Sequence, residues 1–108
     1  MIARIWHGCT EPDKAAAYET LLKTEIFHHI KNKEIPGFID IQLLRNEMAT
    51  ETEFVTIMRF ENIESVKQFA GENYTQAVVP ETAQQLLKRY DKVSQHYEIK
   101  EYLAAVKK

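Results

Sequence analysis

Two adjacent residues near the N-terminus, Trp6 and His7, pair the largest hydrophobic side chain with an imidazole, which can take up or release a proton near neutral pH. They end an apolar, β-branched stretch, residues 2–7, that predicts a strand. Side chains alternate along a strand, so one of the two faces the covering helices and the other faces away. The spacing leaves open which residue faces the helices.

A second imidazole, that of His96, lies in residues 92–99, which predict the last strand. If that strand runs beside the first, His7 and His96 line one cavity, where His7 would act as the general base and His96 would assist it. Four aromatic residues are expected to shape the same cavity: Trp6, Tyr18, Phe69 and Tyr74. Such a cavity, without a charged anchor, suits a small apolar or aromatic ligand such as a phenol or quinone. The alternative is that each histidine is a hydrogen-bonded group of the core.

Three further signals are weaker. Glu25 and His29 are four residues apart on a predicted helix, so the carboxylate either orients the imidazole toward a cavity or forms an ion pair at the helix rim. The neighbours His28 and His29 lie about 100° apart on a helix, which disfavours a shared metal. Cys9 is expected to be a small buried hydrophobic residue rather than a nucleophile. The sequence has no glycine-rich phosphate loop, HExxH motif or paired cysteines, so we expect neither a metal nor a cofactor.

A helix is predicted to follow the first strand. Thr10 is expected to cap its N-terminus, with Pro12 in the first turn. An apolar stripe at helical spacing then runs through Ala15, Tyr18, Leu22 and Ile26. The helix is expected to end near Lys31, before a turn at residues 36–37.

The middle of the chain predicts a hairpin and a second helix. Residues 38–45 and 53–60 are the two strands of the hairpin. The helix is expected between Asn62, as its N-cap, and Gly71, as its C-cap. A further short helix is expected after Pro80, and the C-terminal tail is expected to form a loose helical turn.

The order strand, helix, strand, strand, helix, strand is typical of the α+β, ferredoxin-like split βαβ fold, a four-stranded antiparallel sheet with helices on one face. The two hairpin strands, however, carry apolar residues on both faces. On the first of them, Ile39, Ile41 and Leu43 point one way and Phe38 and Leu44 the other. One layer of helices covers one face only, so we expect a second copy to cover the other, in a homodimer.

Composition bounds the function. The 108 residues have the length of one domain, residues 1–108. With 14 basic and 16 acidic residues the net charge is -2, which disfavours nucleic acid as a partner because phosphate binding needs a basic patch. No apolar stretch approaches the about 20 residues of a membrane span, and no signal peptide is recognisable, so we expect no membrane association. A single cysteine excludes an internal disulfide, and we expect a cytoplasmic location.

Five stretches, RIWHGCT, PGF, EFVTIMRF, FAGENYTQAVVP and HYEI, together resemble the antibiotic biosynthesis monooxygenase family of dimeric α+β barrels, in particular its uncharacterised bacterial members. The resemblance spans residues 2–98. It implies a homodimer with a pocket between sheet and helices in each subunit. Some members of that family oxidise polycyclic phenols to quinones with molecular oxygen and without metal or flavin, because the electron-rich substrate anion itself reduces oxygen.

Other members of the family degrade haem, using an Asn near the end of strand one, a Trp in helix two and a haem-ligating His just after it. Here His7 stands near the position of the Asn, Phe69 near that of the Trp, and Val78 or Val79 near that of the haem ligand. A valine cannot ligate iron, so haem degradation is not expected.

The sequence therefore predicts a cofactor-independent monooxygenase that acts on a phenolic or quinol-type small molecule. Two alternatives stay open. One is a non-catalytic small-molecule-binding or stress-associated protein that uses the same pocket. The other is a different acid/base reaction, such as isomerisation or lactone chemistry.

Overall fold

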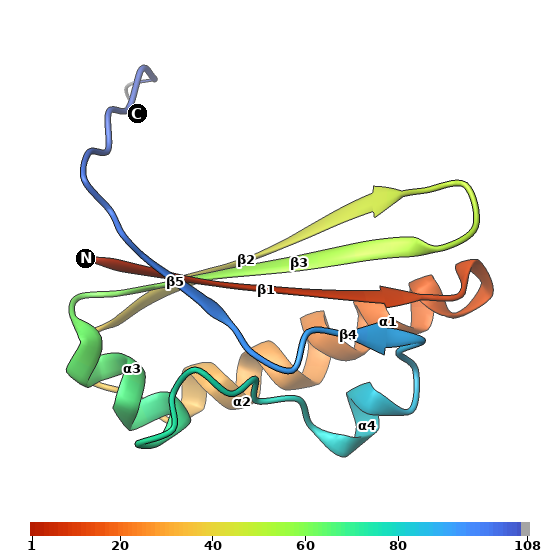
Figure 1. Cartoon of the computed structure of the whole chain (residues 1–108), viewed down its shortest axis with the longest axis horizontal. Coiled ribbons are helices and arrows are strands. Elements are labelled where there is room, and N and C mark those ends of the chain that lie inside the picture. The colour runs from red at the N-terminus through yellow and green to blue at the C-terminus, as the bar shows by residue number, and fades with distance from the viewer. Residues whose placement is uncertain (107–108) are drawn as a thin grey trace.

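The computed structural model describes residues 1–106 and shows one antiparallel sheet with helices on one of its faces (Figure 1). The strands are β1 (Ile2–Thr10), β2 (Phe38–Glu47), β3 (Thr52–Phe60), β4 (Arg89–Tyr90) and β5 (Gln95–Glu98). The helical segments are η1 (Pro12–Lys14), α1 (Ala15–Leu21), η2 (Leu22–Ile26), α2 (Phe27–Asn32), α3 (Ile63–Ala70) and α4 (Glu81–Gln84). Neighbouring strands follow the order β2-β3-β1-β4, and β5 also pairs with β1. The predicted α+β, ferredoxin-like fold is confirmed.

The first helical region begins differently from the prediction. Thr10 is the last residue of β1, where it pairs with Thr52, and its buried hydroxyl has no hydrogen-bond partner among residues 1–106. The residue that precedes η1 is Glu11, whose side chain makes no capping bond. The predicted Thr10 cap is therefore wrong, because pairing with β3 keeps the chain extended through Thr10.

A π-helical segment, η2, lies between α1 and α2 and joins them into one run of helix. Its wider turn is visible in the hydrogen bond that the N–H of Phe27 donates to the carbonyl of Leu22, five residues back. The predicted apolar stripe faces the sheet, with Ala15, Tyr18 and Leu22 buried. Single π turns of this kind are frequent at functional sites.

The predicted ends of α3 and the predicted turn before β2 are confirmed. The side-chain oxygen of Asn62 accepts a hydrogen bond from the N–H of Ser65 at 3.0 Å. Gly71 ends α3 with a φ of +89°. The turn before β2 holds Gly37 at a φ of +84°, and a Cβ there would lie 1.9 Å from the hydroxyl oxygen of Ser65.

The last predicted strand is divided. β4 pairs with Gly8 and Cys9 at one end of β1, and β5 pairs with residues 2–5 at the other end. The chain between them leaves the sheet, where Val93 forms a bridge with Gln76. The tail shows no helix over residues 101–106, and Lys107 and Lys108, which the predicted helical turn included, lie outside the described residues.

A β-bulge corrects the predicted faces of β2. Pairing with β3 shifts register between Phe38 and Asp40. The extra residue puts Phe38 on the same, helix-facing side as Ile41, where both pack against Phe60 and its neighbours. The prediction that Phe38 and Ile41 point to opposite faces is therefore wrong, because strict alternation does not survive a bulge.

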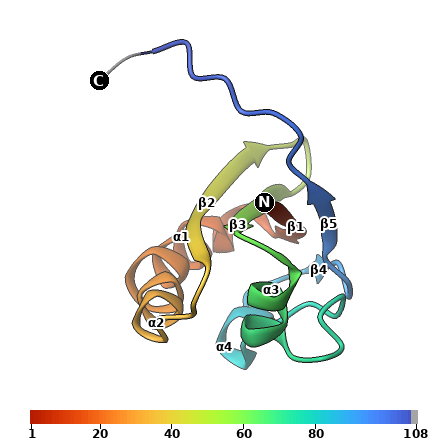
Figure 2. The ribbon, with the colours of Figure 1, turned by 90° about the vertical axis from the view of Figure 1, so that its left-hand side faces the viewer.

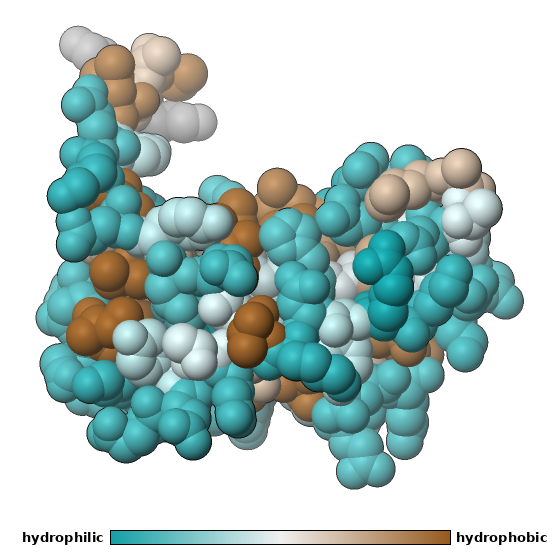
Figure 3. Space-filling model, in the orientation of Figure 1, coloured by the Kyte–Doolittle hydropathy of each residue, from teal (hydrophilic) through white to brown (hydrophobic). Residues whose placement is uncertain are grey.

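The opposite face of the sheet, which we call the open face, carries no helix formed by residues 1–106 (Figure 2). Ile5, Val55 and Ile57 are only half-buried there, and Leu44 is exposed. The C-terminal tail rises on this side, away from the helices (Figure 2), and its apolar residues stand clear of the body in Figure 3. Leu103 is 83% exposed and Val106 70%. Both the face and the tail thus present apolar surface to solvent.

Candidate functional site

A cavity of about 60 Å³ lies between the sheet and the helices. η2 and α2 cover it on one side, β1 and β3 form its floor, and Phe69 and the segment after it close it. Most of its lining is aliphatic or aromatic. The lining residues that carry a polar group are Arg4, Trp6, Tyr18, Thr56 and Ser94.

Trp6, and not His7, is the residue that faces the helices. Its ring lines the cavity, and its indole N–H donates to the carbonyl of Asp91 at 2.9 Å, which uses its only donor. The ring lies flat along β1 because the next residue on that face is Gly8, where a Cβ would come within 2.5 Å of the indole. Trp6 therefore offers a ligand an aromatic surface only.

Tyr18 reaches the cavity from α1 and is 1% exposed. Its ring packs on Phe54, with centroids 4.8 Å apart. The hydroxyl makes no hydrogen bond with any of residues 1–106. Burial raises the pKa of Tyr18 well above its usual value, so the hydroxyl stays protonated and can donate to a ligand.

Arg4 also lines the cavity, although sequence analysis did not select it. It is 3% exposed. Its Nη1 donates to the carbonyl of Tyr74 at 2.5 Å, and its Nη2 donates to the carbonyl of Gln76 at 3.0 Å. Burial lowers the pKa of Arg4 to about 10, so it remains a cation at neutral pH. The prediction of a cavity without a charged anchor is wrong, and Arg4 could have been found because it lies two residues before Trp6 on the same face of a strand.

His96 and Tyr74 stand beside Arg4 and outside the lining of the cavity. The Nε2 atom of His96 lies 2.9 Å from Nη1 of Arg4, and its ring meets that of Tyr74 edge-on at 5.1 Å. Burial, and then the charge of Arg4, lowers the pKa of His96. His96 therefore touches the cavity's cation rather than a ligand.

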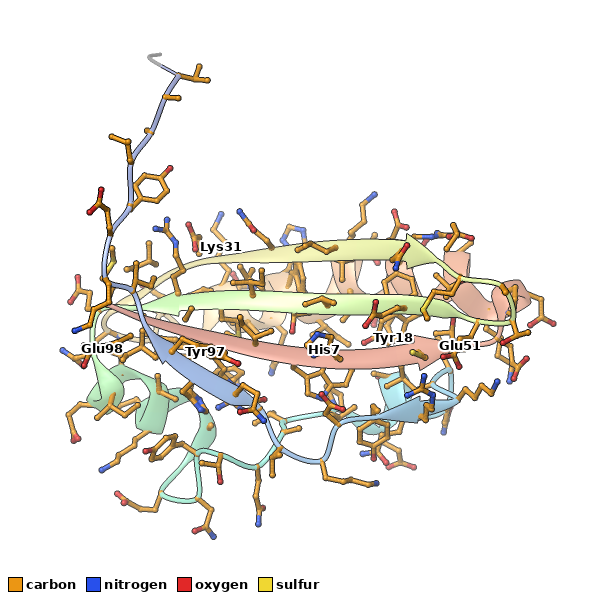
Figure 4. The ribbon with its side chains drawn as sticks, turned by 45° about the horizontal axis from the view of Figure 1, so that its top comes forward. His7, Tyr18, Lys31, Glu51, Tyr97 and Glu98 are labelled. Atoms are coloured by element: carbon orange, nitrogen blue, oxygen red, sulfur yellow. The ribbon has the colours of Figure 1, made fainter. Side chains whose placement is uncertain are left out.

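His7 lies on the open face (Figure 4), where Nδ1 is 3.5 Å from a carboxylate oxygen of Asp91 and the side chain is 43% exposed. The expectation that His7 and His96 line one cavity is wrong, because Trp6 occupies the helix-facing position of that residue pair. Phe69, by contrast, lines the cavity as expected. A catalytic role for His7 stays a prediction, and it would have to be exercised on the open face.

An outer groove of about 340 Å³ adjoins the cavity and shares five of its lining residues, Ile26, Ile30, Phe69, Val78 and Pro80. Its outer rim carries Glu25, His29 and Lys33. No hydrogen bond or ion pair joins Glu25 to His29 in the described part of the chain. The helix-rim ion pair is thus not formed, and both side chains lie on the rim of the groove.

Three other expectations can be compared with residues 1–106. Cys9 is buried, and burial raises the pKa of its thiol, as expected of a small core residue. No three His, Cys, Asp or Glu side chains of this part cluster as metal ligands would. None of its helices has the length and apolar character to span a bilayer.

No family model and no curated protein matches the sequence. Solved structures do match. A Bacillus cereus protein assigned to the antibiotic biosynthesis monooxygenases superposes with a TM-score of 0.68 at 16% identity, over 96% of this chain and 97% of that one. The haem degrader MhuD of Mycobacterium tuberculosis, solved with two haems in its active site, gives 0.62 at 18% identity, over 96% and 100%. SnoaB of Streptomyces nogalater, a cofactor-independent oxygenase, gives 0.58 at 15% identity, over 94% and 96%.

These likenesses span nearly the whole chain and confirm, at the level of the fold, the resemblance that the sequence motifs indicated. At 15 to 18% identity they show a common fold, and the activity of this chain does not follow from them. At the positions compared with the haem-ligand site, Val78 and Val79 line the cavity with aliphatic side chains.

Proposed function

We propose that the protein is an oxygenase that converts a small phenol to a quinone with molecular oxygen. The observation that carries the proposal is the buried aromatic cavity with a cation in its wall, in the fold of a known oxygenase. In the reaction a ring C–H carbon gains one atom of O₂. The second oxygen atom leaves as water with that hydrogen and the phenolic hydrogen. The ring loses four electrons, which O₂ gains.

The cavity residues would bind and ionise the substrate. Trp6 and Phe69 provide flat walls for an aromatic ring. The positive charge of Arg4, in surroundings of low dielectric constant, favours ionisation of a phenol. Tyr18 is a neutral donor for the phenolate oxygen. We assign His96 to positioning, because it touches Arg4 and not the cavity lining.

The size of the cavity restricts how a substrate would sit. A volume of about 60 Å³ is below the 150 Å³ or so in which a benzene molecule is known to bind. The outer groove adds about 340 Å³ on the far side of shared aliphatic residues. We infer that side chains between the two spaces move apart, so that the substrate extends from the cavity into the groove.

Oxygen uptake tests the proposal. The purified protein, treated with a chelator, is incubated with a panel of hydroquinones, anthrones and hydroxyaryl compounds in an oxygen-electrode cell. We expect uptake with formation of the quinone. Replacing Tyr18 by Phe keeps the ring and removes the donor, so uptake should fall by about 10²-fold. The matched control is Tyr97→Phe. Tyr97 is an exposed residue that pairs with Ala3 of β1 on the open face, so this change should not alter the rate.

Two outcomes would contradict the oxygenase. Panel compounds that raise the melting temperature without any uptake would favour the non-catalytic binding protein. Turnover that proceeds equally well under argon would favour an acid/base reaction such as isomerisation.

We further propose that the protein is a cytoplasmic homodimer in which two open faces meet. Apolar residues of the sheet and of the tail lie on the same side of the subunit (Figure 2). A two-fold pairing would bury both at once, since each subunit offers the same surface to the other. The catalytic cavity would then lie away from the interface, beneath the helix-covered face.

A further inference from the structure

Arg4 differs from the other arginines of the chain in its electrostatic partners. The sequence has four arginines. Arg45 pairs with Glu19 and Glu47, Arg59 pairs with Asp40, and Arg89 pairs with Glu51. Arg4, the most deeply buried of them, has no carboxylate partner among residues 1–106. Within these residues it is thus a buried cation without a counter-charge, an arrangement that is strongly unfavourable unless an anion accompanies it.

The N–H groups of Arg4 that have no partner among the described residues lie on Nε and Nη2, the atoms through which another arginine of this protein holds a carboxylate. A guanidinium has five N–H groups. Both N–H groups of Nη1 and one of Nη2 contact Tyr74, His96 and Gln76, which leaves the Nε–H and one Nη2–H without a partner in the described residues. Nε and Nη2 are the atoms through which Arg59 holds both oxygens of Asp40, at 2.9 Å and 2.5 Å.

A second, independent donor lies in the same cavity. Residue Tyr18 is 1% exposed, its hydroxyl makes no hydrogen bond with residues 1–106, and its raised pKa keeps it protonated. The guanidinium of Arg4 has no acceptor atom for a ligand. The indole of Trp6 has none either, and its single N–H is already bonded to the carbonyl of Asp91. The ligand group that satisfies Arg4 is therefore an acceptor, and beside a guanidinium it is negatively charged.

The rest of the ligand is apolar. The guanidinium carbon of Arg4 lies 5.5 Å from the centroid of the Phe69 ring, which also borders the outer groove. Phe69 therefore offers an aromatic surface beside Arg4, and most of the remaining lining of the cavity is apolar. A molecule with its charged group at Arg4 would place an aromatic or aliphatic body against this surface.

We infer that the cavity binds an aromatic carboxylic acid, with its carboxylate held by Arg4 and its ring against Phe69. The substrate of the proposed oxygenase would then be a hydroxyaryl acid. Only the reaction of the bound acid rests on the proposed function. The binding itself is independent of oxygen.

Calorimetry under argon tests the inference with 4-hydroxybenzoate and its neutral counterpart 4-hydroxybenzamide, which have nearly the same shape. The wild-type protein should bind the acid at least about tenfold more tightly than the amide, as a charge-assisted hydrogen-bond pair predicts. Arg4→Met should abolish this preference. Arg4→Lys, which keeps a charge but loses the planar fork, should retain part of it. Arg45→Met removes a paired, exposed arginine and should leave the preference unchanged.

Equal affinity for acid and amide would overturn the inference, and so would a preference that survives in Arg4→Met or is lost in Arg45→Met. Failure of both compounds to bind would overturn it as well. If Arg4→Met does not fold, the wild-type comparison and Arg4→Lys decide. Binding of the acid through Arg4 without oxygen uptake would contradict the oxygenase alone. Uptake with neutral phenols that survives in Arg4→Lys, without a preference for acids, would contradict this inference alone.

Discussion

The guanidinium of Arg4 and the imidazole of His96 meet across the paired strands β1 and β5, with Nη1 and Nε2 2.9 Å apart. An arginine can only donate, so Nε2 of His96 accepts and the ring proton of the neutral imidazole lies on Nδ1. The contact exists only while His96 is neutral, because protonation would place two cations in contact. The position of the cavity's cation is therefore coupled to the charge of His96.

His96 is expected to make stability depend on pH. Its pKa is lowered in the folded protein, by burial first and by Arg4 second, so the unfolded chain binds the proton more tightly. The stabilising contribution is complete above the ordinary value of 6.5 and is lost as the pH falls below it. Thermal melts between pH 8 and pH 5 check this. His96→Gln keeps an acceptor and should flatten the decline, whereas a matching change at exposed His28 should not; equal slopes for both variants would refute the coupling.

Gly37 is expected to resist substitution more than Gly71. Both have a positive φ, so alanine strains the backbone by about 1 to 2 kcal/mol at either position. Only at Gly37 does the new Cβ also collide, 1.9 Å from the Ser65 hydroxyl oxygen, whereas at Gly71 no atom of the described residues lies within 4 Å. We expect Gly37→Ala to lower the free energy of unfolding by about 2 kcal/mol more than Gly71→Ala does. Urea titration of the two variants measures the difference, and a similar loss in both would contradict the steric argument.

The variant His7→Ala tests whether His7, which the sequence predicted as the general base, acts in the reaction despite its position outside the cavity. A general base must lie within hydrogen-bond reach of the proton it removes, and His7 is on the face opposite the cavity. Oxygen uptake by the variant is thus expected to fall far less than the about 10²-fold loss that follows removal of a general base. A loss of that size, with acid binding intact, would move the reaction to the open face and restore His7 as its base.

The proposed homodimer makes a prediction at Ile57, which is half-buried on the open face. Light scattering at micromolar concentration should give the mass of a dimer for the wild-type chain. A charge placed at the centre of an apolar interface is strongly unfavourable, so Ile57→Glu should give a monomer. Thr20→Glu, on the exposed side of α1, serves as the control and should remain dimeric. A monomeric wild-type protein would remove the reason for an apolar open face.

Local rules were sufficient for much of this protein. The alternation and helical spacing of apolar residues predicted the order of strands and helices, and short-range chemistry predicted the ends of α3 at Asn62 and Gly71. The same periodicities selected Tyr18 and Phe69 as walls of the site. Residues with helical spacing share one face of a helix regardless of what that helix packs against, so this part of the site could be predicted.

Other features depended on contacts between distant parts of the chain, and only the tertiary structure decided them. The choice between Trp6 and His7 was set by which face of β1 the helices cover. The bulge at Phe38 was set by pairing with β3. Above all, the sequence determined that Arg4 lies two residues before Trp6, but not that it is buried without a carboxylate partner among residues 1–106. Whether a charged side chain has a partner of opposite charge depends on every element packed around it. The spacing of residues along one strand does not determine this.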